Sequence, residues 1–209
     1  MWGRRGTGGR LLAALAGLAV AVLAGCSSVG KYDPAPAVAA SPDYRYKIGT
    51  GDSVSVVVWR NPELSQTVSV RPDGRLTMPL VEDLPALGRT PTELARDIEQ
   101  VLSKFVRDPV VTVIVAGASG PFSEQIRIIG EATTPQALPY RQDMTMLDVM
   151  IAVGGLTDFA DGNKTVLVRG AEQGKMYTVR LNDLIKRGDI SANVDVKPGD
   201  VLIIPQSWF

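Results

Sequence analysis

The chain of 209 residues contains no histidine and only one cysteine, Cys26. Histidine is the usual general base at neutral pH and the commonest metal ligand, so its absence excludes Ser–His and Cys–His catalysis and histidine metal sites. A single cysteine can form neither an intrachain disulfide nor a thiolate zinc site. The composition therefore indicates no metal and no cofactor, and it leaves carboxylate pairs as the remaining route to catalysis.

The chain has few acidic residues in positions that suggest catalysis. Cleavage of a glycan requires only two carboxyl groups, and Asp52, Glu63, Asp73 and Asp200 are the candidates. Each of them lies in a predicted turn, where an aspartate side chain bonds the backbone amides that follow it. Turn formation explains these residues better than catalysis does, so we expect no catalytic residues and no enzyme activity.

A strongly basic balance is also absent, because the chain carries 22 basic and 22 acidic residues. Arg4, Arg5 and Arg10 fall within the first 25 residues, where there is no acidic residue, so the remainder is net acidic. Binding to nucleic acid depends on a basic surface that neutralises phosphates. Nucleic acid is therefore not an expected partner.

The N-terminal segment has the pattern of a secretory signal. Three arginines precede an apolar run over residues 11–24, which is shorter than the roughly 20 residues that a membrane-spanning helix needs. The run ends in Leu-Ala-Gly-Cys, which resembles a bacterial lipobox. This resemblance implies that residues 1–25 are a lipoprotein signal peptide and that Cys26 carries the acyl chains that attach the protein to the outer membrane.

Residues 26–43 are rich in Ser, Ala and Pro and show no apolar period. Such a composition is typical of a linker. Pro34, Pro36 and Pro42 argue against a regular strand or helix. The sequence therefore predicts a flexible tether between the anchor and the folded body.

Residues 44–117 begin as a β-rich unit. Gly49 and Gly51 permit a chain reversal, Asp52 can cap it, and the next strand alternates with Val54 and its i+2 neighbours on one face. Strands over residues 67–70 and 76–79 are predicted to meet through Arg-Pro-Asp-Gly-Arg. The residues that shape these turns are Gly49, Gly51, Asp52, Pro62, Asp73 and Gly74.

A helix follows at Thr90-Pro91-Thr92-Glu93, which has the sequence of a capping box with proline at the first helical position. A strand is predicted over residues 110–115. The apolar stripe of the helix consists of Leu94, Ile98, Val101, Leu102 and Phe105.

The opening of this unit carries a long ordered motif. It reads Y-x-I-G-x-G-D, then V-x-V-W-x-N-P-E-L-S and V-R-P-D-G, and it ends in M-P-L. The motif resembles the export domain of Wza-type polysaccharide export lipoproteins, with Thr50 in place of the usual proline. The resemblance implies a polysaccharide export domain over residues 44–117.

A second unit is predicted over residues 123–206. It contains a strand from residue 126, a helix that starts at Thr145 with Leu147, Met150 and Ile151 facing inward, a hairpin, and a last strand after Pro198-Gly199-Asp200. The order of these elements resembles the SLBB version of the β-grasp fold. The whole chain is therefore predicted to be α+β: a small β-rich export domain followed by a β-grasp-like SLBB domain.

The resemblance is to the short form of these lipoproteins, as found in exosortase-associated exopolysaccharide clusters. It implies a periplasm-facing protein that forms a homo-oligomeric ring and passes a capsular or exopolysaccharide. The implied partners are the polysaccharide, an inner-membrane chain-length regulator or co-polymerase, and a separate outer-membrane pore protein, since the given sequence ends at Phe209 without a terminal amphipathic helix.

Two alternatives remain open: a periplasmic β-grasp ligand-binding module or scaffold of an envelope complex, and a glycan-processing enzyme. Trp208 and Phe209, two aromatic residues at the end of the sequence, form a candidate contact surface. Trp59 is expected to pack into the core of its own unit or to cover the rim of that core, although aromatic rings also stack on sugars.

Overall fold

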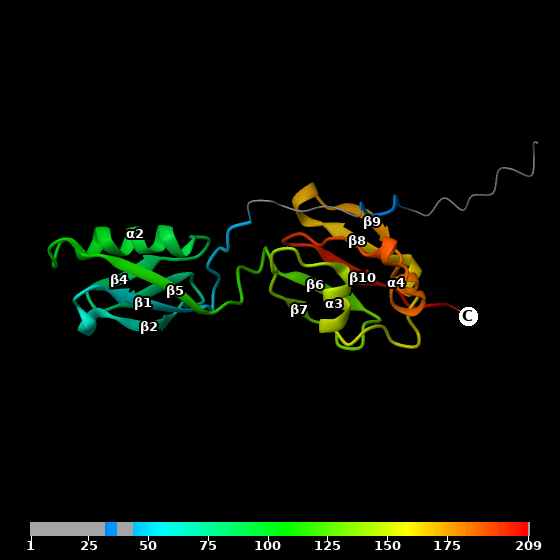
Figure 1. Cartoon of the computed structure of the whole chain (residues 1–209), viewed down its shortest axis with the longest axis horizontal. Helices are drawn as coiled ribbons and strands as arrows, with labels where there is room; N and C mark the ends of the chain where they lie inside the picture. Colours follow the sequence, from blue (N-terminus) through cyan, green and yellow to red (C-terminus); the bar gives the residue numbers. More distant parts are fainter. Residues whose placement is uncertain (1–31, 37–43, 209) are drawn as a thin grey trace, which may run out of the picture. The chain divides into compact units, whose positions relative to one another are not determined.

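The computed structural model describes residues 32–36 and 44–208 (Figure 1). The predicted signal peptide, Cys26, most of the predicted tether and Phe209 lie outside the described residues. None of the helices in the described part of the chain has the length and apolar composition that a membrane span requires. Two separate hydrophobic cores define a first lobe, with buried residues between positions 48 and 113, and a second lobe, with buried residues between positions 126 and 204.

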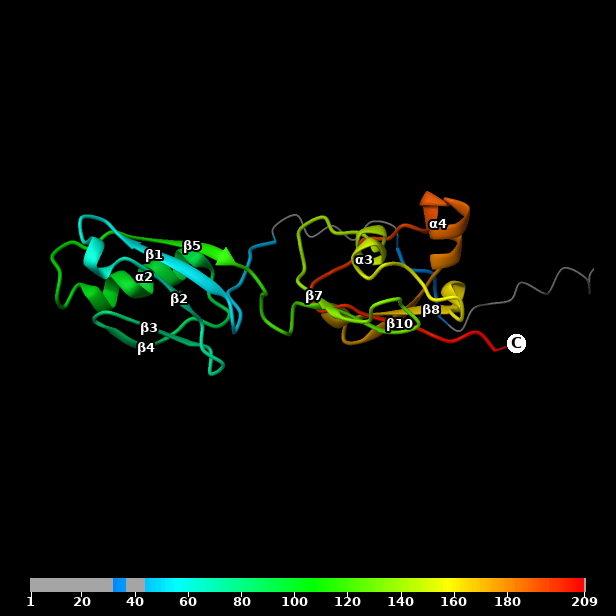
Figure 2. The same ribbon diagram turned by 90° about the horizontal axis from the view of Figure 1, so that it is seen from below.

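The first lobe is built around strand β1 (Ser53–Val58), which pairs antiparallel with β2 (Gln66–Ser69) on one side and β5 (Val111–Gly117) on the other. Val54, Val56 and Val58 are buried, as the alternation predicts. A short 3₁₀ helix, η1 (Pro62–Leu64), follows β1. Hairpin β3 (Arg75–Met78) and β4 (Val81–Pro85) forms a separate sheet on the opposite side of the lobe (Figure 2).

The prediction that the second and third strands of this lobe form a hairpin was wrong. The turn itself forms, because Gly74 adopts φ +78° and Gly74 N–H donates to the Arg71 carbonyl at 2.9 Å. The two strands then diverge, since β2 pairs with β1 while β3 pairs with β4. A turn motif fixes the local reversal, but the partner of each strand depends on contacts distant in sequence.

Helix α2 (Pro91–Leu102) starts at the predicted capping box. Thr90 N–H donates to the Glu93 carboxylate at 2.9 Å, and Glu93 N–H donates to the Thr90 hydroxyl at 3.2 Å. The helix buries Leu94, Ile98 and Leu102. Phe105 was expected in the same stripe but is 61% exposed, because the helix ends before it.

The second lobe is a five-stranded sheet in the order β7-β6-β10-β8-β9, with β6 and β10 parallel at its centre. Figure 2 shows α3 and α4 on the same side of this sheet. The α+β prediction is confirmed. The elements of this lobe are β6 (Ile126–Gly130), β7 (Ala137–Leu138), α3 (Met146–Ala152), η2 (Gly162–Lys164), β8 (Thr165–Arg169), η3 (Gly170–Glu172), β9 (Lys175–Val179), α4 (Leu181–Arg187), η4 (Ile190–Ala192) and β10 (Val201–Ile204).

Two features of the second lobe differ from the expectation. Helix α4 was not predicted, and α3 buries Met146, Val149 and Met150 instead of the predicted stripe. Ile151 is consequently 71% exposed. The predicted stripe was displaced by one residue, which rotates the buried face of a helix by about 100°.

Part of the segment that was predicted as a flexible tether pairs with the second lobe. Pro34 forms a parallel bridge with Thr178 of β9, and Ala35 packs against the core of the lobe. The sequence contains no apolar alternation there, so the pairing could not be predicted from its pattern.

Candidate binding surfaces and the turns beside them

Asp52 is fully buried and connects the start of the first lobe to the segment that follows its last strand. Its Oδ2 accepts from Gly49 N–H at 2.7 Å and from the Tyr46 hydroxyl. Its Oδ1 accepts from the N–H groups of Ser119 and Gly120 at 2.7 and 3.1 Å. Four donors surround one carboxylate, so its burial is compensated by hydrogen bonds rather than by a cation.

The turn around Asp52 requires glycine at two positions for different reasons. Gly51 adopts φ +83°, which residues with a Cβ rarely adopt. Gly49 has no such conformation, but a Cβ there would lie 2.1 Å from the backbone carbon of Gly120. Burial and the hydrogen bond to Asp52 also raise the pKa of Tyr46, so its hydroxyl remains a donor at neutral pH.

Asp200 occupies a comparable turn in the second lobe but is compensated differently. Its Oδ2 accepts from Arg169 Nη1 at 3.2 Å and from Lys197 N–H at 2.8 Å. The side chains of Arg169 and Asp200 are both fully buried. Arg169 Nη2 also donates to the Asp195 carbonyl at 3.0 Å. Burial raises the pKa of Asp200 to about 6, although Lys197 N–H and Arg169 oppose the shift.

The remaining predicted turn residues lie in local structures. Pro62 begins η1, Gly199 adopts φ +81° beside Pro198, and Gly74 adopts a left-handed conformation next to Asp73. Asp73 is exposed, pairs with Arg71 and accepts from Arg75 N–H at 3.2 Å. Asp52 and Asp200 are buried and bonded within their turns, and Asp73 is paired at the surface, so the geometry supports turn roles for these three carboxylates.

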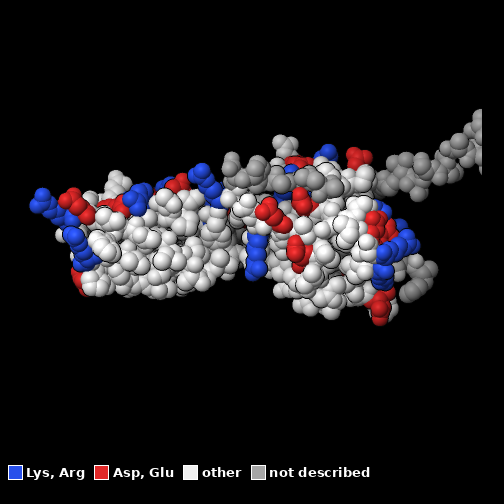
Figure 3. Space-filling view, in the orientation of Figure 1, with Lys and Arg blue, Asp and Glu red and all other residues white. Residues whose placement is uncertain are grey.

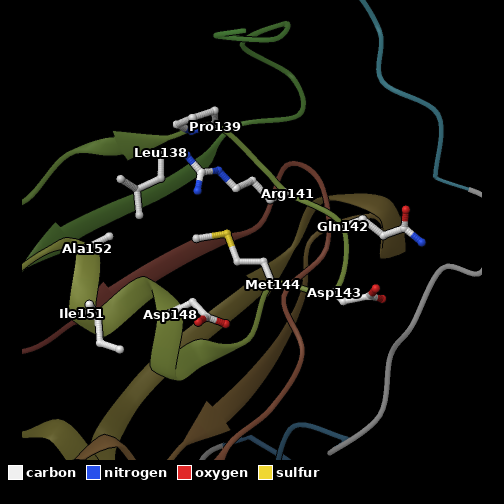
Figure 4. A pocket seen from close by; sticks show the side chains of 9 residues that line it. All are labelled: Leu138, Pro139, Arg141, Gln142, Asp143, Met144, Asp148, Ile151 and Ala152. Carbon is white, nitrogen blue, oxygen red and sulfur yellow. The ribbon is translucent and has the colours of Figure 1, made fainter.

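The second lobe carries an open groove of about 490 Å³ between the end of β7 and helix α3 (Figure 4). Its apolar part contains Leu138, Met144 and Ile151, and Figure 4 shows the Arg141 guanidinium beside Leu138 and Met144. The lining consists of Leu138, Pro139, Arg141, Gln142, Asp143, Met144, Asp148, Ile151 and Ala152.

The charged groups of the groove differ in their freedom to bind a ligand. Asp148 accepts from Thr145 N–H at 2.9 Å and from the Thr145 hydroxyl at 2.7 Å, and these bonds lower its pKa. The guanidinium of Arg141 makes no ion pair or hydrogen bond to the described residues. A guanidinium that has no partner among the described residues and lies next to apolar side chains suits a ligand with both a carboxylate and a C–H surface.

The first lobe presents an uncharged face. The outward residues of β1, β2 and β5 are Ser, Thr, Val and Ile, and Figure 3 shows no charged side chain over this face. Trp59 at the end of β1 is 65% exposed, and Ile114 and Val57 are 53% and 40% exposed. An uncharged face that exposes large apolar side chains of this kind indicates an interaction surface. The uncharged face consists of Ser55, Val57, Trp59, Thr67, Ser69, Thr112 and Ile114.

Trp59 therefore does not pack into the core, which was one of the two positions expected for it. Trp208 is 93% exposed, while its predicted companion Phe209 lies outside the described residues. Sequence reasoning missed the groove, because its lining combines a loop, a two-residue strand and the outer face of α3. In the described ranges, no group of three or more acidic or cysteine side chains could hold a metal ion.

Comparison with known proteins gives two adjacent matches. A model described as polysaccharide biosynthesis/export protein matches residues 40–116, and an SLBB domain model matches residues 124–204. The "EPS I polysaccharide export outer membrane protein EpsA" of Ralstonia nicotianae is 30% identical over 77% of this chain and 47% of its own length.

Two further relatives are more distant. The "Exopolysaccharide production protein ExoF" of Rhizobium meliloti is 27% identical over 77% of this chain and 40% of its own length. The "Capsule polysaccharide export protein BexD" of Haemophilus influenzae is 23% identical over 76% and 43%. The chain thus spans about half the length of the curated relatives it matches.

The buried pair of Arg169 and Asp200 generates a pH-dependent prediction. Arg169→Met leaves an unpaired buried carboxylate and should lower the free energy of unfolding at pH 7.5 by about 3–5 kcal/mol. The folded-state pKa of Asp200 is already above its ordinary value and rises further without Arg169. The Asp200 carboxylate of the folded variant therefore takes up a proton as the pH falls. The loss of unfolding free energy should consequently be smaller at pH 5 than at pH 7.5. Urea unfolding at both pH values measures this.

Arg180→Met is the matched control, because Arg180 is half-exposed and the buried Asp183 that it pairs with keeps Arg187 and Asn163 as partners. Arg180→Met should lower the free energy of unfolding by no more than about 1 kcal/mol, and this loss should not become smaller at pH 5 as it does for Arg169→Met. An equal loss for Arg169→Met at pH 5 and pH 7.5 would contradict the role assigned to Asp200.

Proposed function

The chain belongs to the Wza-type polysaccharide export proteins, and from this premise we propose that it is an outer-membrane-anchored periplasmic lipoprotein that forms part of the export conduit for a capsular or exopolysaccharide. The observation that carries the proposal is the succession of an export domain and an SLBB domain over residues 40–204. The printed names of its relatives, polysaccharide export and exopolysaccharide production proteins, support it. The proposed role is transport and not catalysis.

A conduit for a polymer requires several copies of a chain of this size, and we propose a homo-oligomeric ring. Rings arise when one surface of a subunit binds a different surface of the next. The uncharged face of the first lobe suits one half of such a contact, because Trp59, Val57 and Ile114 expose apolar area without charges that would have to be desolvated. An inner-membrane chain-length regulator and a separate outer-membrane pore protein are the further proposed partners.

The groove of the second lobe is proposed to contact the polymer. A sugar ring offers hydroxyl groups at its edge and C–H groups on its faces, and the groove offers Gln142 and Asp143 beside Leu138 and Ile151. Arg141, which has no side-chain partner among the described residues, favours a polymer that carries carboxylate groups, because its planar fork matches carboxylate geometry.

A second candidate function rests on the same groove. A periplasmic ligand-binding module or scaffold of an envelope complex would use it for a small ligand rather than for a passing polymer. The two candidates differ in what happens to the polysaccharide when the protein is absent.

Deletion of the gene in the bacterium that encodes it should stop the appearance of polysaccharide outside the cell while sugar polymer remains detectable in the cell fraction. Loss of a conduit blocks passage but does not remove the enzymes of synthesis. The measurement is the amount of polymer in the medium and in the cell pellet, with the gene restored on a plasmid as the control.

The same assay tests the groove. A plasmid carrying Arg141→Ala together with Ile151→Ala should restore export only partly, while Lys186→Ala on α4, away from the groove, should restore it fully. Undiminished extracellular polymer in the deletion strain would contradict the conduit and favour the ligand-binding module.

Trp59→Glu should dissociate the proposed ring. A carboxylate placed in a contact that includes Val57 and Ile114 would have to lose its hydration, which is costly without a partner. Native mass spectrometry of the detergent-extracted protein should show a lower copy number for this variant. Phe105→Glu is the matched control, since it places the same charge at an exposed aromatic position outside the uncharged face. Retention of the oligomer in Trp59→Glu would place the contact elsewhere.

Cys26→Ser should abolish membrane attachment. A hydroxyl cannot form the thioether that carries the acyl chains, and each buried methylene of such a chain contributes about 0.8 kcal/mol to membrane binding. Metabolic labelling with a fatty-acid analogue should mark the wild type and not the variant. Equal labelling of both proteins would show that the anchor is attached at another residue.

A further inference from the structure

The segment of residues 33–35 lies along strand β9, which is one of the two edge strands of the five-stranded sheet. Thr178 N–H donates to the Asp33 carbonyl at 2.8 Å, and Ala35 N–H donates to the Thr178 carbonyl at 3.1 Å. These are the two hydrogen bonds of a parallel bridge centred on Pro34. Although its composition is that of a linker, the segment extends the sheet by one short strand.

The spacing of the prolines matches this pairing. In an extended strand, the backbone groups of successive residues point to opposite sides, so Asp33 and Ala35 face β9 while Pro34 and Pro36 face away from it. A proline has no N–H donor, and at the outward positions that loss removes no bond to β9. In the sequence Asp-Pro-Ala-Pro, the two residues that face β9 carry backbone N–H groups, and the two residues that face away from β9 are prolines, which have none.

Packing supports the same register. Ala35 is half-buried and contacts the core of the second lobe, whereas Pro34 and Pro36 are exposed. Without the segment, the Thr178 N–H and carbonyl groups that now bind Asp33 and Ala35 would face outward along an edge strand. An exposed edge strand pairs readily with other chains, and proline on the edge is one of the devices that prevent such pairing.

We propose that residues 33–36 form a closing strand for β9: a short extended peptide that occupies the edge of the sheet and cannot itself accept a further strand. The partner surface is the outward edge of β9 at Thr178, and the occupant is the chain's own Asp-Pro-Ala-Pro segment. The closing strand turns part of the linker into a component of the second lobe. It does not depend on the proposed role in export.

Hydrogen exchange of the full-length lipoprotein in detergent tests the docking. Ala35→Pro removes the N–H that donates to Thr178 and should accelerate exchange of the Thr178 amide at least tenfold. Pro36→Ala changes an outward position and should leave that exchange slow. The amides of β8 and β10 report that the lobe remains folded in both variants.

Thr178 exchange that is equally fast in the wild type and in Ala35→Pro would overturn the docking. The role of the prolines is tested by Pro34→Val combined with Pro36→Val, which adds N–H donors to the outer edge and keeps the bonds to β9. This variant should show a concentration-dependent rise in mass by light scattering beyond that of Pro42→Val. Identical masses would overturn the closing of the edge.

Discussion

Both lobes depend on the burial of a carboxylate in a turn. A carboxylate that leaves water must be met by hydrogen-bond donors, because an unpaired buried charge costs several kcal/mol. In the first lobe the donors are the Tyr46 hydroxyl and three backbone N–H groups, one at Gly49 and two in the segment after β5. Gly49 allows these two stretches of backbone to approach within van der Waals distance of each other. Asp52 thus determines where the chain enters and leaves the lobe.

The second lobe meets the same constraint with a cation. Arg169 extends from β8 into the interior and shares Asp200 with one backbone donor. The donors to Asp52 are uncharged, so that turn does not depend on any cation. The turn at Asp200 depends on one charged side chain, that of Arg169 on β8. The two Gly-Asp turns are alike in sequence and differ in the source of their stability.

The sequence predicts those features of the fold that are determined within a few residues. The capping box at Thr90, the left-handed Gly74 and the alternation of β1 depend on neighbours along the chain, and all three form as predicted. The partner of β2 and the docking of residues 33–35 depend on segments that are distant in sequence, and no local pattern carries that information. The exposure of Phe105 and Ile151 has a third origin, since an apolar residue next to a helix stripe cannot be assigned to the core until the end and rotation of the helix are known.

The candidate surfaces were hidden from the sequence for a related reason. The alternation of β1 identifies Val54 and Val56 as the inner face, and the same alternation assigns Val57 and Trp59 to the outer face without saying what covers them. In this lobe α2 and hairpin β3–β4 contribute to the core on the inner side, so the uncharged face is left for a partner. The groove arises in the same way, because α3 uses Met146, Val149 and Met150 for the core and leaves Ile151 outside next to Arg141. Each of these elements packs one face against the core. Any contact with a polymer or with another copy must therefore use the face that remains exposed.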